Sequence, residues 1–220
     1  MLILELFSGT KSIGKAFQKL GWDVFSVDID EKTKPTLATD VLQLEFAELG
    51  IQPDFVWGSP PCTHYSAART KAKTPRDLTG SDRLVQKVLD AARYFKVPFM
   101  FENPFTGLLK HRAVVEGIPM QVVDYCKYGK PYRKRTSIWT NTGWKPKRCL
   151  CKYDCAATVP GCMRHKACAQ QGPPGVRCTR DELYSIPENL CDEIAMFVAC
   201  SGNSAGSNLP LLIGDGRPRL

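Results

Sequence analysis

The chain has 220 residues, 43% hydrophobic and 24% charged, a balance typical of one domain with a full core. No apolar run reaches the roughly 18–20 residues that a membrane span needs, and no charged region precedes the apolar N-terminus. We therefore expect a soluble, unsecreted, monomeric protein without membrane contact. Ten cysteines without a secretion signal indicate a reducing intracellular compartment, cytoplasmic or nuclear. The protein itself could be of cellular, viral or phage origin.

The formal net charge of +8 is unevenly distributed along the chain. Residues 127–180 carry thirteen Lys or Arg residues and a single acidic residue, Asp154. Such a concentration of positive charge predicts a polyanionic partner, and nucleic acid is the commonest one.

Strands and helices are expected to alternate along the first 140 residues. Buried apolar runs predict strands at residues 1–7, 22–29, near Asp40, at 55–57 and at 98–101, and periodic apolar faces predict helices at 12–20, 42–49 and 81–95. Further strands are expected at 120–125 and 137–140, and a last helix at 188–199. This alternation predicts an α/β fold with a doubly wound, mostly parallel sheet, whose ligands bind at the carboxyl ends of its strands.

Glycine and acidic residues follow the first three predicted strands. Gly9 lies in the turn after the first strand, where backbone N–H groups can approach a ligand closely. Asp28 ends the second strand, where a carboxylate accepts hydrogen bonds from ribose hydroxyls, and Asp40 ends the third. Because the turn matches neither the dinucleotide nor the phosphate-loop pattern, we expect a nucleoside-bearing cofactor without a large phosphate cradle.

A cysteine and a glutamate follow the next two predicted strands. Residues 59–62 read Ser-Pro-Pro-Cys, and the two prolines end the strand at 55–57, so that Cys62 is presented on a rigid turn. Glu102 directly follows the strand at 98–101. A thiol and a carboxyl group at the tips of two buried strands predict a nucleophile and an acid–base partner above one sheet edge.

Four segments together resemble the cytosine-C5 DNA methyltransferase family, and they occur in the family's order. Residues 4–14 (Leu-Glu-Leu-Phe-Ser-Gly-Thr-Lys-Ser-Ile-Gly) resemble its methyl-donor motif, and residues 58–66 (Gly-Ser-Pro-Pro-Cys-Thr-His-Tyr-Ser) its Pro-Cys loop. Residues 101–104 (Phe-Glu-Asn-Pro) resemble its Glu-Asn-Val motif, and residues 128–139 its Gln-x-Arg-x-Arg segment, although the glutamine is replaced. The resemblance implies the S-adenosylmethionine-dependent methyltransferase fold and methyl transfer to C5 of cytosine in DNA.

The resemblance also implies roles for the matched residues. Cys62 would attack C6 of cytosine, Glu102 would hold the base through N3 and N4, and Arg133 and Arg135 would contact the base O2 or a nearby phosphate. A duplex base must also be flipped out, which needs phosphate contacts from the basic region. S-adenosylmethionine, with S-adenosylhomocysteine as its product, would be surrounded by Phe7, Ser8, Gly9, Thr10, Ser12, Asp28, Ile29, Asp40 and Pro60.

The family's long target-recognition domain is missing between the strand at 137–140 and the last helix. Residues 148–180, the Cys-rich segment, replace it and carry closely spaced thiols with few bulky aliphatic residues, which suits zinc binding better than an independent core. Cys126 is expected to be structural, and free or disulfide-bonded thiols are the alternative to a metal site. The expected ligands come from Cys149, Cys151, Cys155, Cys162, His165 and Cys168.

Four regions are therefore expected: a methyltransferase core at 1–147, the Cys-rich segment at 148–180, a helix at 181–200 that packs back on the core, and a flexible tail at 201–220. DNA is the expected substrate, and RNA is the first alternative because a basic segment fits either polymer. The second alternative is an inactive, methyltransferase-like protein that only binds nucleic acid, against which the presence of both Cys62 and Glu102 argues. An amino-methyltransferase is the third, and Cys62 argues against it.

Overall fold

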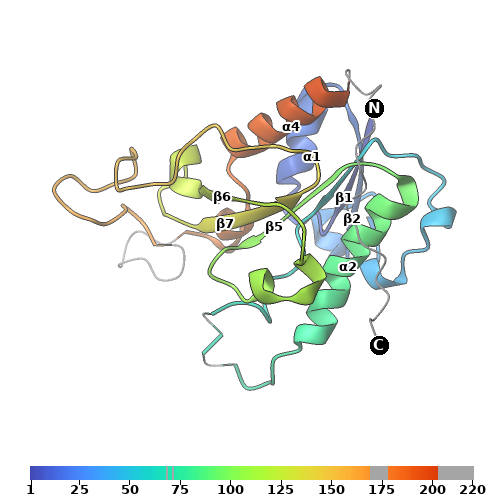
Figure 1. Cartoon of the computed structure of the whole chain (residues 1–220), viewed down its shortest axis with the longest axis horizontal. Helices are drawn as coiled ribbons and strands as arrows, with labels where there is room; N and C mark the ends of the chain where they lie inside the picture. Colours follow the sequence, from blue (N-terminus) through green and yellow to red (C-terminus); the bar gives the residue numbers. More distant parts are fainter. Residues whose placement is uncertain (68, 71, 169–177, 203–220) are drawn as a thin grey trace.

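A computed structural model of the chain describes residues 1–67, 69–70, 72–168 and 178–202. Its centre is a seven-stranded sheet with the order β3-β2-β1-β4-β5-β7-β6 (Figure 1). Strands β1 to β5 pair in parallel, and β7 runs antiparallel to both of its neighbours. The doubly wound, mostly parallel sheet predicted from the sequence is confirmed. The strands are β1 (Leu2–Leu6), β2 (Asp23–Asp28), β3 (Leu37–Ala38), β4 (Phe55–Gly58), β5 (Phe99–Pro104), β6 (Met120–Asp124) and β7 (Arg135–Thr140).

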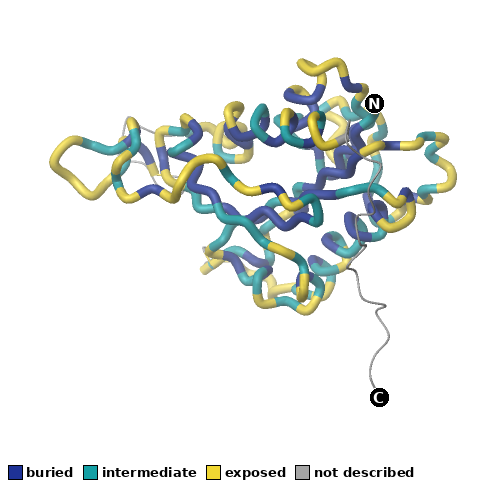
Figure 2. The backbone as a smooth tube through the Cα atoms, turned by 45° about the horizontal axis from the view of Figure 1, so that its top comes forward, coloured by how far each residue is buried: buried dark blue, intermediate teal, exposed yellow. Residues whose placement is uncertain are grey.

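Helices cover both faces of this sheet. Helices α1 (Ser12–Lys19) and α4 (Glu188–Gly202) lie against one face, and α2 (Leu78–Phe95) lies against the other (Figure 1). Because side chains alternate along a strand, Ile3 enters the core under α1 and α4 while Leu4 enters the core under α2. The central strands are therefore buried on both faces, whereas residues 148–168 of the Cys-rich segment form a largely exposed extension (Figure 2).

Two predicted helices differ from the structure. Helix α2 begins three residues earlier than expected, because the side chain of Asp77 accepts a hydrogen bond of 2.7 Å from the N–H of Gly80 and caps the helix there. The helix predicted at 42–49 is wrong. Two 3-10 turns, η2 (Val41–Gln43) and η3 (Phe46–Glu48), occupy this segment, because Leu44 and Glu45 between them adopt extended backbone angles.

The C-terminal part of the described chain is more helical than expected. Helix α3 (Arg180–Tyr184) was not predicted, although Thr179 and Glu182 form a capping box, a recognisable sequence pattern. Helix α4 continues to Gly202, and the tail predicted beyond it lies outside the described residues. The remaining turns are η1 (Glu31–Thr33), η4 (Leu109–His111), η5 (Ala113–Val115) and η6 (Tyr125–Tyr128). None of the helices in the described part of the chain has the length and apolar character of a membrane span.

Strand direction brings distant segments to one edge of the sheet. The carboxyl ends of β1, β2, β4 and β5 define this edge, which we call the carboxyl edge. Because β7 runs the opposite way, its first residue, Arg135, pairs with Asp124 at the end of β6, and Thr136 pairs with Pro104 at the end of β5. The segment before β7 and the turn after β6 therefore lie at the same edge as the loops after β4 and β5.

Candidate active site

The loop that carries Cys62 is fixed to the structure around it. The carbonyl of Pro60 accepts a buried hydrogen bond of 2.9 Å from the side-chain amide of Asn103 on β5. The carbonyl of Cys62 accepts hydrogen bonds of 3.0 and 2.8 Å from the N–H groups of Tyr65 and Ser66. Tyr65 is fully buried and donates a hydrogen bond of 2.7 Å to Asp82 on α2. Cys62 itself stays partly exposed, so its thiol is presented at the carboxyl edge on a firmly held turn.

Glu102 projects from β5 beside this loop. Its neighbour Asn103 makes the bond to Pro60, so one amide connects the Cys62 loop to the strand of Glu102. The Oε2 atom of Glu102 is buried and has no hydrogen-bond partner in the structure. Buried polar atoms are nearly always paired, so an unpaired carboxyl oxygen at the carboxyl edge fits a ligand contact.

The charges of Glu102 and Lys134 act on the Cys62 thiol in opposite directions. Burial raises the pKa of the Cys62 thiol, the negative charge of Glu102 raises that pKa further, and the positive charge of Lys134 opposes both. Burial also raises the pKa of Glu102, again opposed by Lys134. The protein environment thus favours the protonated forms of both the thiol and the carboxyl group.

The three cations before and at the start of β7 have different environments. Arg133 is exposed, and its guanidinium lies 4.9 Å from the ring centroid of Tyr153. Arg135 makes two hydrogen bonds, of 2.9 and 2.8 Å, to the buried carboxylate of Asp124. Lys134 interacts electrostatically with Cys62 and Glu102. Of the two arginines predicted from the sequence, one is therefore paired with a carboxylate and the other lies on the surface, whereas Lys134 was missed.

The turn after β1 and the end of β2 are joined at the same edge. The N–H of Gly9 donates a hydrogen bond of 2.8 Å to Asp28 Oδ2, and the N–H of Asp30 donates one of 2.9 Å to Asp28 Oδ1. Phe7 and Gly9 both have positive φ angles, 58° and 43°, so the turn bends sharply back over the strand end. Each oxygen of Asp28 keeps a lone pair that can accept a ligand hydroxyl.

The other expected donor-site residues surround this turn. Ser8 has a buried hydroxyl without a partner, and Ile29 is a large apolar side chain that is 72% exposed beside Asp28. Asp40 follows β3 and caps η2 through a hydrogen bond of 2.9 Å from the N–H of Leu42. Thr10 and Ser12 share a hydroxyl hydrogen bond of 2.7 Å at the start of α1. An unpaired hydroxyl, an exposed apolar side chain and free carboxylate lone pairs suit a nucleoside-bearing ligand.

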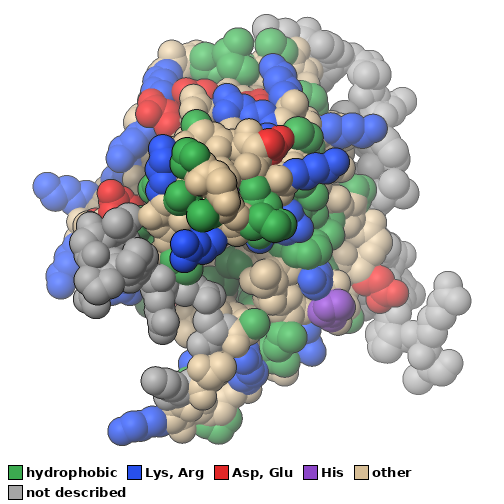
Figure 3. Space-filling view, turned by 90° about the vertical axis from the view of Figure 1, so that its left-hand side faces the viewer, with side chains coloured by type: hydrophobic (Ala, Val, Ile, Leu, Met, Phe, Trp, Pro, Cys, Tyr) green, Lys and Arg blue, Asp and Glu red, His purple; other side chains and the backbone are tan. Residues whose placement is uncertain are grey.

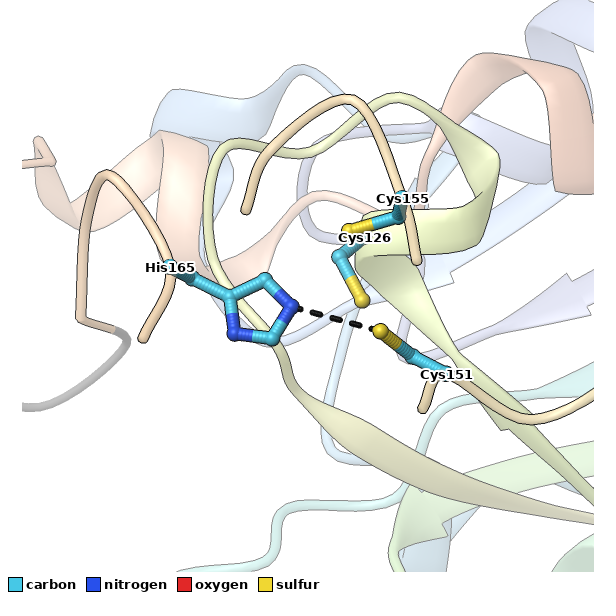
Figure 4. Close-up of side chains that lie close together, drawn as sticks. All are labelled: Cys126, Cys151, Cys155 and His165. Atoms are coloured by element: carbon cyan, nitrogen blue, oxygen red, sulfur yellow. Dashed lines mark hydrogen bonds between the residues drawn. The ribbon is translucent and has the colours of Figure 1, made fainter. Parts of the chain in front are cut away.

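A cluster of thiols and one imidazole lies beyond Arg135 at the same edge. The ligand atoms of Cys126, Cys151, Cys155 and His165 all lie within 4.8 Å of one another (Figure 4). Three of these residues were expected as metal ligands, but Cys126, expected to be structural, is the fourth. Cys149, Cys162 and Cys168, which the sequence also suggested, are exposed and lie outside the cluster.

The face formed by the Cys-rich segment is mainly basic. Figure 3 views the molecule from this side and shows Lys and Arg side chains around a hollowed surface, with few acidic ones among them. The exposed cations of residues 127–168 are Arg133, Lys145, Lys147, Arg148, Lys152, Arg164 and Lys166. The charge concentration seen in the sequence is therefore displayed on the surface, beside the carboxyl edge.

Comparison with known proteins assigns the family. No protein-family model matches the chain. A curated protein of Frog virus 3 (isolate Goorha), named "Probable DNA (cytosine-5)-methyltransferase", is 34% identical over 216 residues, which cover 88% of this chain and 98% of that protein. The chain belongs to the cytosine-C5 DNA methyltransferase family. Its seven-stranded, mostly parallel sheet with helices on both faces agrees with the fold expected from the resemblance.

Two solved methyltransferases are similar to part of this chain. S. pombe Dnmt2 methyltransferase is 14% identical, with 66% of this chain and 53% of that one covered and a TM-score of 0.49. Entamoeba histolytica methyltransferase EhMeth is 13% identical, with 64% and 52% covered and a TM-score of 0.48. The chain thus spans about half the length of these solved methyltransferases.

Proposed function

We propose that this chain transfers a methyl group from S-adenosylmethionine to C5 of cytosine in DNA through a covalent Cys62 adduct. The observation that carries the proposal is the buried hydrogen bond from Asn103 to the carbonyl of Pro60. This bond holds the nucleophile loop against β5. Glu102, the residue before Asn103 on that strand, has an unpaired buried carboxyl oxygen. DNA is proposed as the substrate because the Frog virus 3 relative is named for that activity.

The residues around Asp28 fit S-adenosylmethionine. Asp28 can accept hydrogen bonds from the ribose hydroxyls, since each of its oxygens binds one backbone N–H and retains accepting capacity. The exposed side chain of Ile29 offers an apolar surface for the adenine ring, and Asp40 lies at the end of the adjacent strand. S-adenosylmethionine, when bound there, supplies the methyl group and leaves as S-adenosylhomocysteine.

Cys62 and Glu102 supply complementary chemistry for an unreactive base. Cytosine C6 is a poor electrophile, so the attacking group must be a thiolate. As the sulfur of Cys62 bonds to C6, the electron pair of the C5–C6 double bond moves to C5, which becomes nucleophilic. Burial raises the pKa of Glu102, which favours a protonated carboxyl group that can donate toward N3 and accept from the N4 amino group, so that it stabilises the activated ring. After methylation, loss of the C5 proton and cleavage of the C–S bond restore the aromatic base and the cysteine.

Lys134 provides positive charge where thiolate forms. Its charge lowers the pKa of Cys62 against the effects of burial and of Glu102. When the carboxyl group of Glu102 is protonated, it carries no negative charge that opposes ionisation of the thiol, and Lys134 is then the charged neighbour that favours the thiolate of Cys62.

The basic face supplies nonspecific contacts to the polymer. Exposed cations such as Arg133, Lys152 and Arg164 can neutralise phosphates, and a duplex base must be flipped out at a cost of a few kcal/mol before Cys62 can reach it. Phosphate contacts beside the carboxyl edge would hold the strand while its base occupies the site.

Trapping with 5-fluorocytosine tests the proposal. Because fluorine at C5 cannot leave as a proton does, the adduct should survive denaturant when the protein meets methyl donor and 5-fluorocytosine DNA. Cys62→Ser should abolish the adduct, and Cys200→Ser, which changes an exposed cysteine of α4, should retain it. Duplex DNA, single-stranded DNA and RNA are compared in parallel. An adduct on RNA alone would overturn DNA as the substrate, and no adduct on any polymer with a folded protein would overturn the enzymatic assignment.

A further inference from the structure

The cluster of Cys126, Cys151, Cys155 and His165 joins three separate parts of the chain. Cys126 lies in η6, directly after the sheet, whereas the other three residues belong to the Cys-rich segment (Figure 4). Cys151 Sγ and His165 Nε2 are 3.4 Å apart. Four ligands on a tetrahedron with bonds of about 2.3 Å lie about 3.8 Å from one another, so the observed cluster needs only a small contraction to surround an ion.

The backbone is shaped to bring these side chains together. Tyr153 adopts a positive φ of 65°, and its N–H points at Cys151 Sγ over 3.3 Å, a contact that stabilises a thiolate. Thr158 and His165 pair as an isolated antiparallel bridge, which turns the histidine back toward Cys155. The N–H of Ala167 then donates a hydrogen bond of 3.0 Å to the carbonyl of Pro131, so the end of the loop returns to the core.

The composition of the cluster suits zinc. Three thiols and one imidazole form a common structural zinc ligand set, whereas calcium and magnesium prefer oxygen. The cysteines of the cluster form no disulfide. Among the residues that the structure describes, the apolar cluster here comprises Cys126, Cys151 and Ala157 with Cys155 against them, too small a group to order the loop by burial alone.

Hydrogen bonds connect this cluster to Arg135, and aromatic and cation–π contacts connect it to Arg133. The N–H of Cys151 donates a buried hydrogen bond of 2.9 Å to Asp124, the carboxylate that holds Arg135. The ring of Tyr153 lies 5.5 Å from the ring of His165 and supports the guanidinium of Arg133 on its face. A metal ion that holds Cys151 and His165 in place would therefore also hold Asp124 and Tyr153, the residues that contact Arg135 and Arg133.

We propose that Cys126, Cys151, Cys155 and His165 bind a single zinc ion that fastens the Cys-rich segment to η6 and positions Arg133 and Arg135 for nucleic acid. Binding converts three thiols to thiolates, and their protons pass to solvent. The metal site stands independently of the methyl-transfer reaction. The positioning role rests on the proposed function, because it assumes that nucleic acid occupies the carboxyl edge.

Metal analysis of the full-length protein tests the ligand set. After purification with zinc and dialysis, wild type should hold one zinc per chain. Cys155→Ser and His165→Ala should lose it. Cys149→Ser and Cys162→Ser are matched controls, since these exposed cysteines lie nearby but outside the cluster, and both should keep the ion. Replacement by cobalt should give the absorption of a tetrahedral thiolate site. A folded wild type without zinc, or loss of zinc in Cys149→Ser, would overturn the assignment.

Rescue by a conservative ligand separates positioning from simple unfolding. His165→Cys offers a fourth thiolate, so it should recover both zinc and DNA affinity, whereas His165→Ala should recover neither. Zinc loss should raise the KM for DNA about tenfold or more, because both arginines lose their supports, while the KM for S-adenosylmethionine stays within about twofold. An equal rise in both KM values, or unchanged DNA affinity in zinc-free His165→Ala, would refute the positioning role. Zinc loss with an intact Cys62 adduct would leave the proposed reaction standing.

Discussion

Gly58 lets α2 pack closely against β4, four residues before the nucleophile. A Cβ atom added at Gly58 would lie 2.6 Å from Cγ2 and 2.9 Å from Cγ1 of Val88, closer than real Cβ contacts. Overpacking of this kind typically costs about 1–3 kcal/mol. We therefore expect Gly58→Ala to lower the free energy of unfolding by about 2 kcal/mol and to slow adduct formation, because β4 must move away from α2 and carries the Cys62 loop with it.

A double-mutant cycle isolates this contact. Val88 is fully buried, so Val88→Ala alone should cost about 2–3 kcal/mol for two lost methyl groups and the cavity they leave. In the double variant the new methyl group at position 58 enters that cavity. The double variant should therefore be about as stable as Val88→Ala alone, a coupling of about 2 kcal/mol, equal to the cost of Gly58→Ala by itself.

Urea unfolding followed by circular dichroism measures the cycle. Gly58→Ala combined with Val85→Ala is the matched control, because Val85 is equally buried in α2 but is not among the closest atoms to Gly58. These two changes should be additive within about 0.5 kcal/mol. If the losses of stability caused by Gly58→Ala and Val88→Ala are also additive, the close approach of α2 does not limit the size of the side chain at position 58.

Three further outcomes are expected. Tyr65→Phe removes the hydroxyl that donates to Asp82 beneath the Cys62 loop. It should lower the free energy of unfolding by about 1–2 kcal/mol, measured in urea, and slow formation of the Cys62 adduct. Tyr94→Phe, a change at an exposed tyrosine, should have neither effect. Burial raises the pKa of Glu5 from 4.5 to about 7, so the stability that its proton provides at pH values below the unfolded pKa is lost as the pH rises through the folded pKa. Glu5→Gln should remove a pH dependence of about 3 kcal/mol between about pH 4 and pH 8, and an unchanged slope would contradict this. Lys134→Gln should raise the pKa of Cys62, because the positive charge of the lysine lowers it. The pH midpoint of Cys62 alkylation, measured by mass spectrometry, should therefore move upward. A downward shift, or none, would show that Lys134 does not act on Cys62.

The sequence predicts the parts of the site that depend on local constraints. Two prolines before Cys62 end β4 whatever the surroundings, and Glu102, directly after the apolar run at 98–101, identifies the neighbouring position at the carboxyl edge. The alternation of strands and helices predicts parallel pairing and hence a common edge for both residues. These inferences need no knowledge of contacts between distant residues.

The missed residues depend on contacts that only the fold creates. Cys126 lies in η6, outside the Cys-rich segment, and spacing alone favoured the nearer Cys149 and Cys162 as ligands. Lys134 is flanked by two arginines that match the family pattern, and the antiparallel direction of β7 brings this segment to the carboxyl edge. The sequence did hold one indication of the position of Cys126. It directly follows the strand predicted at 120–125, so it lies at one end of a strand of the sheet.

The Cys-rich segment begins and ends beside η6. Near its start, the side chain of Arg148 donates to the carbonyl of Lys127, and just after its end Lys130 donates hydrogen bonds of 3.2 and 2.6 Å to Glu182 and Ser185. An insertion whose two ends lie close together can be lengthened, shortened or exchanged without altering the path of the surrounding strands. The segment can therefore vary in length without displacing β7 or α4, so changes within it leave the strands that position Cys62 and Glu102 where they are.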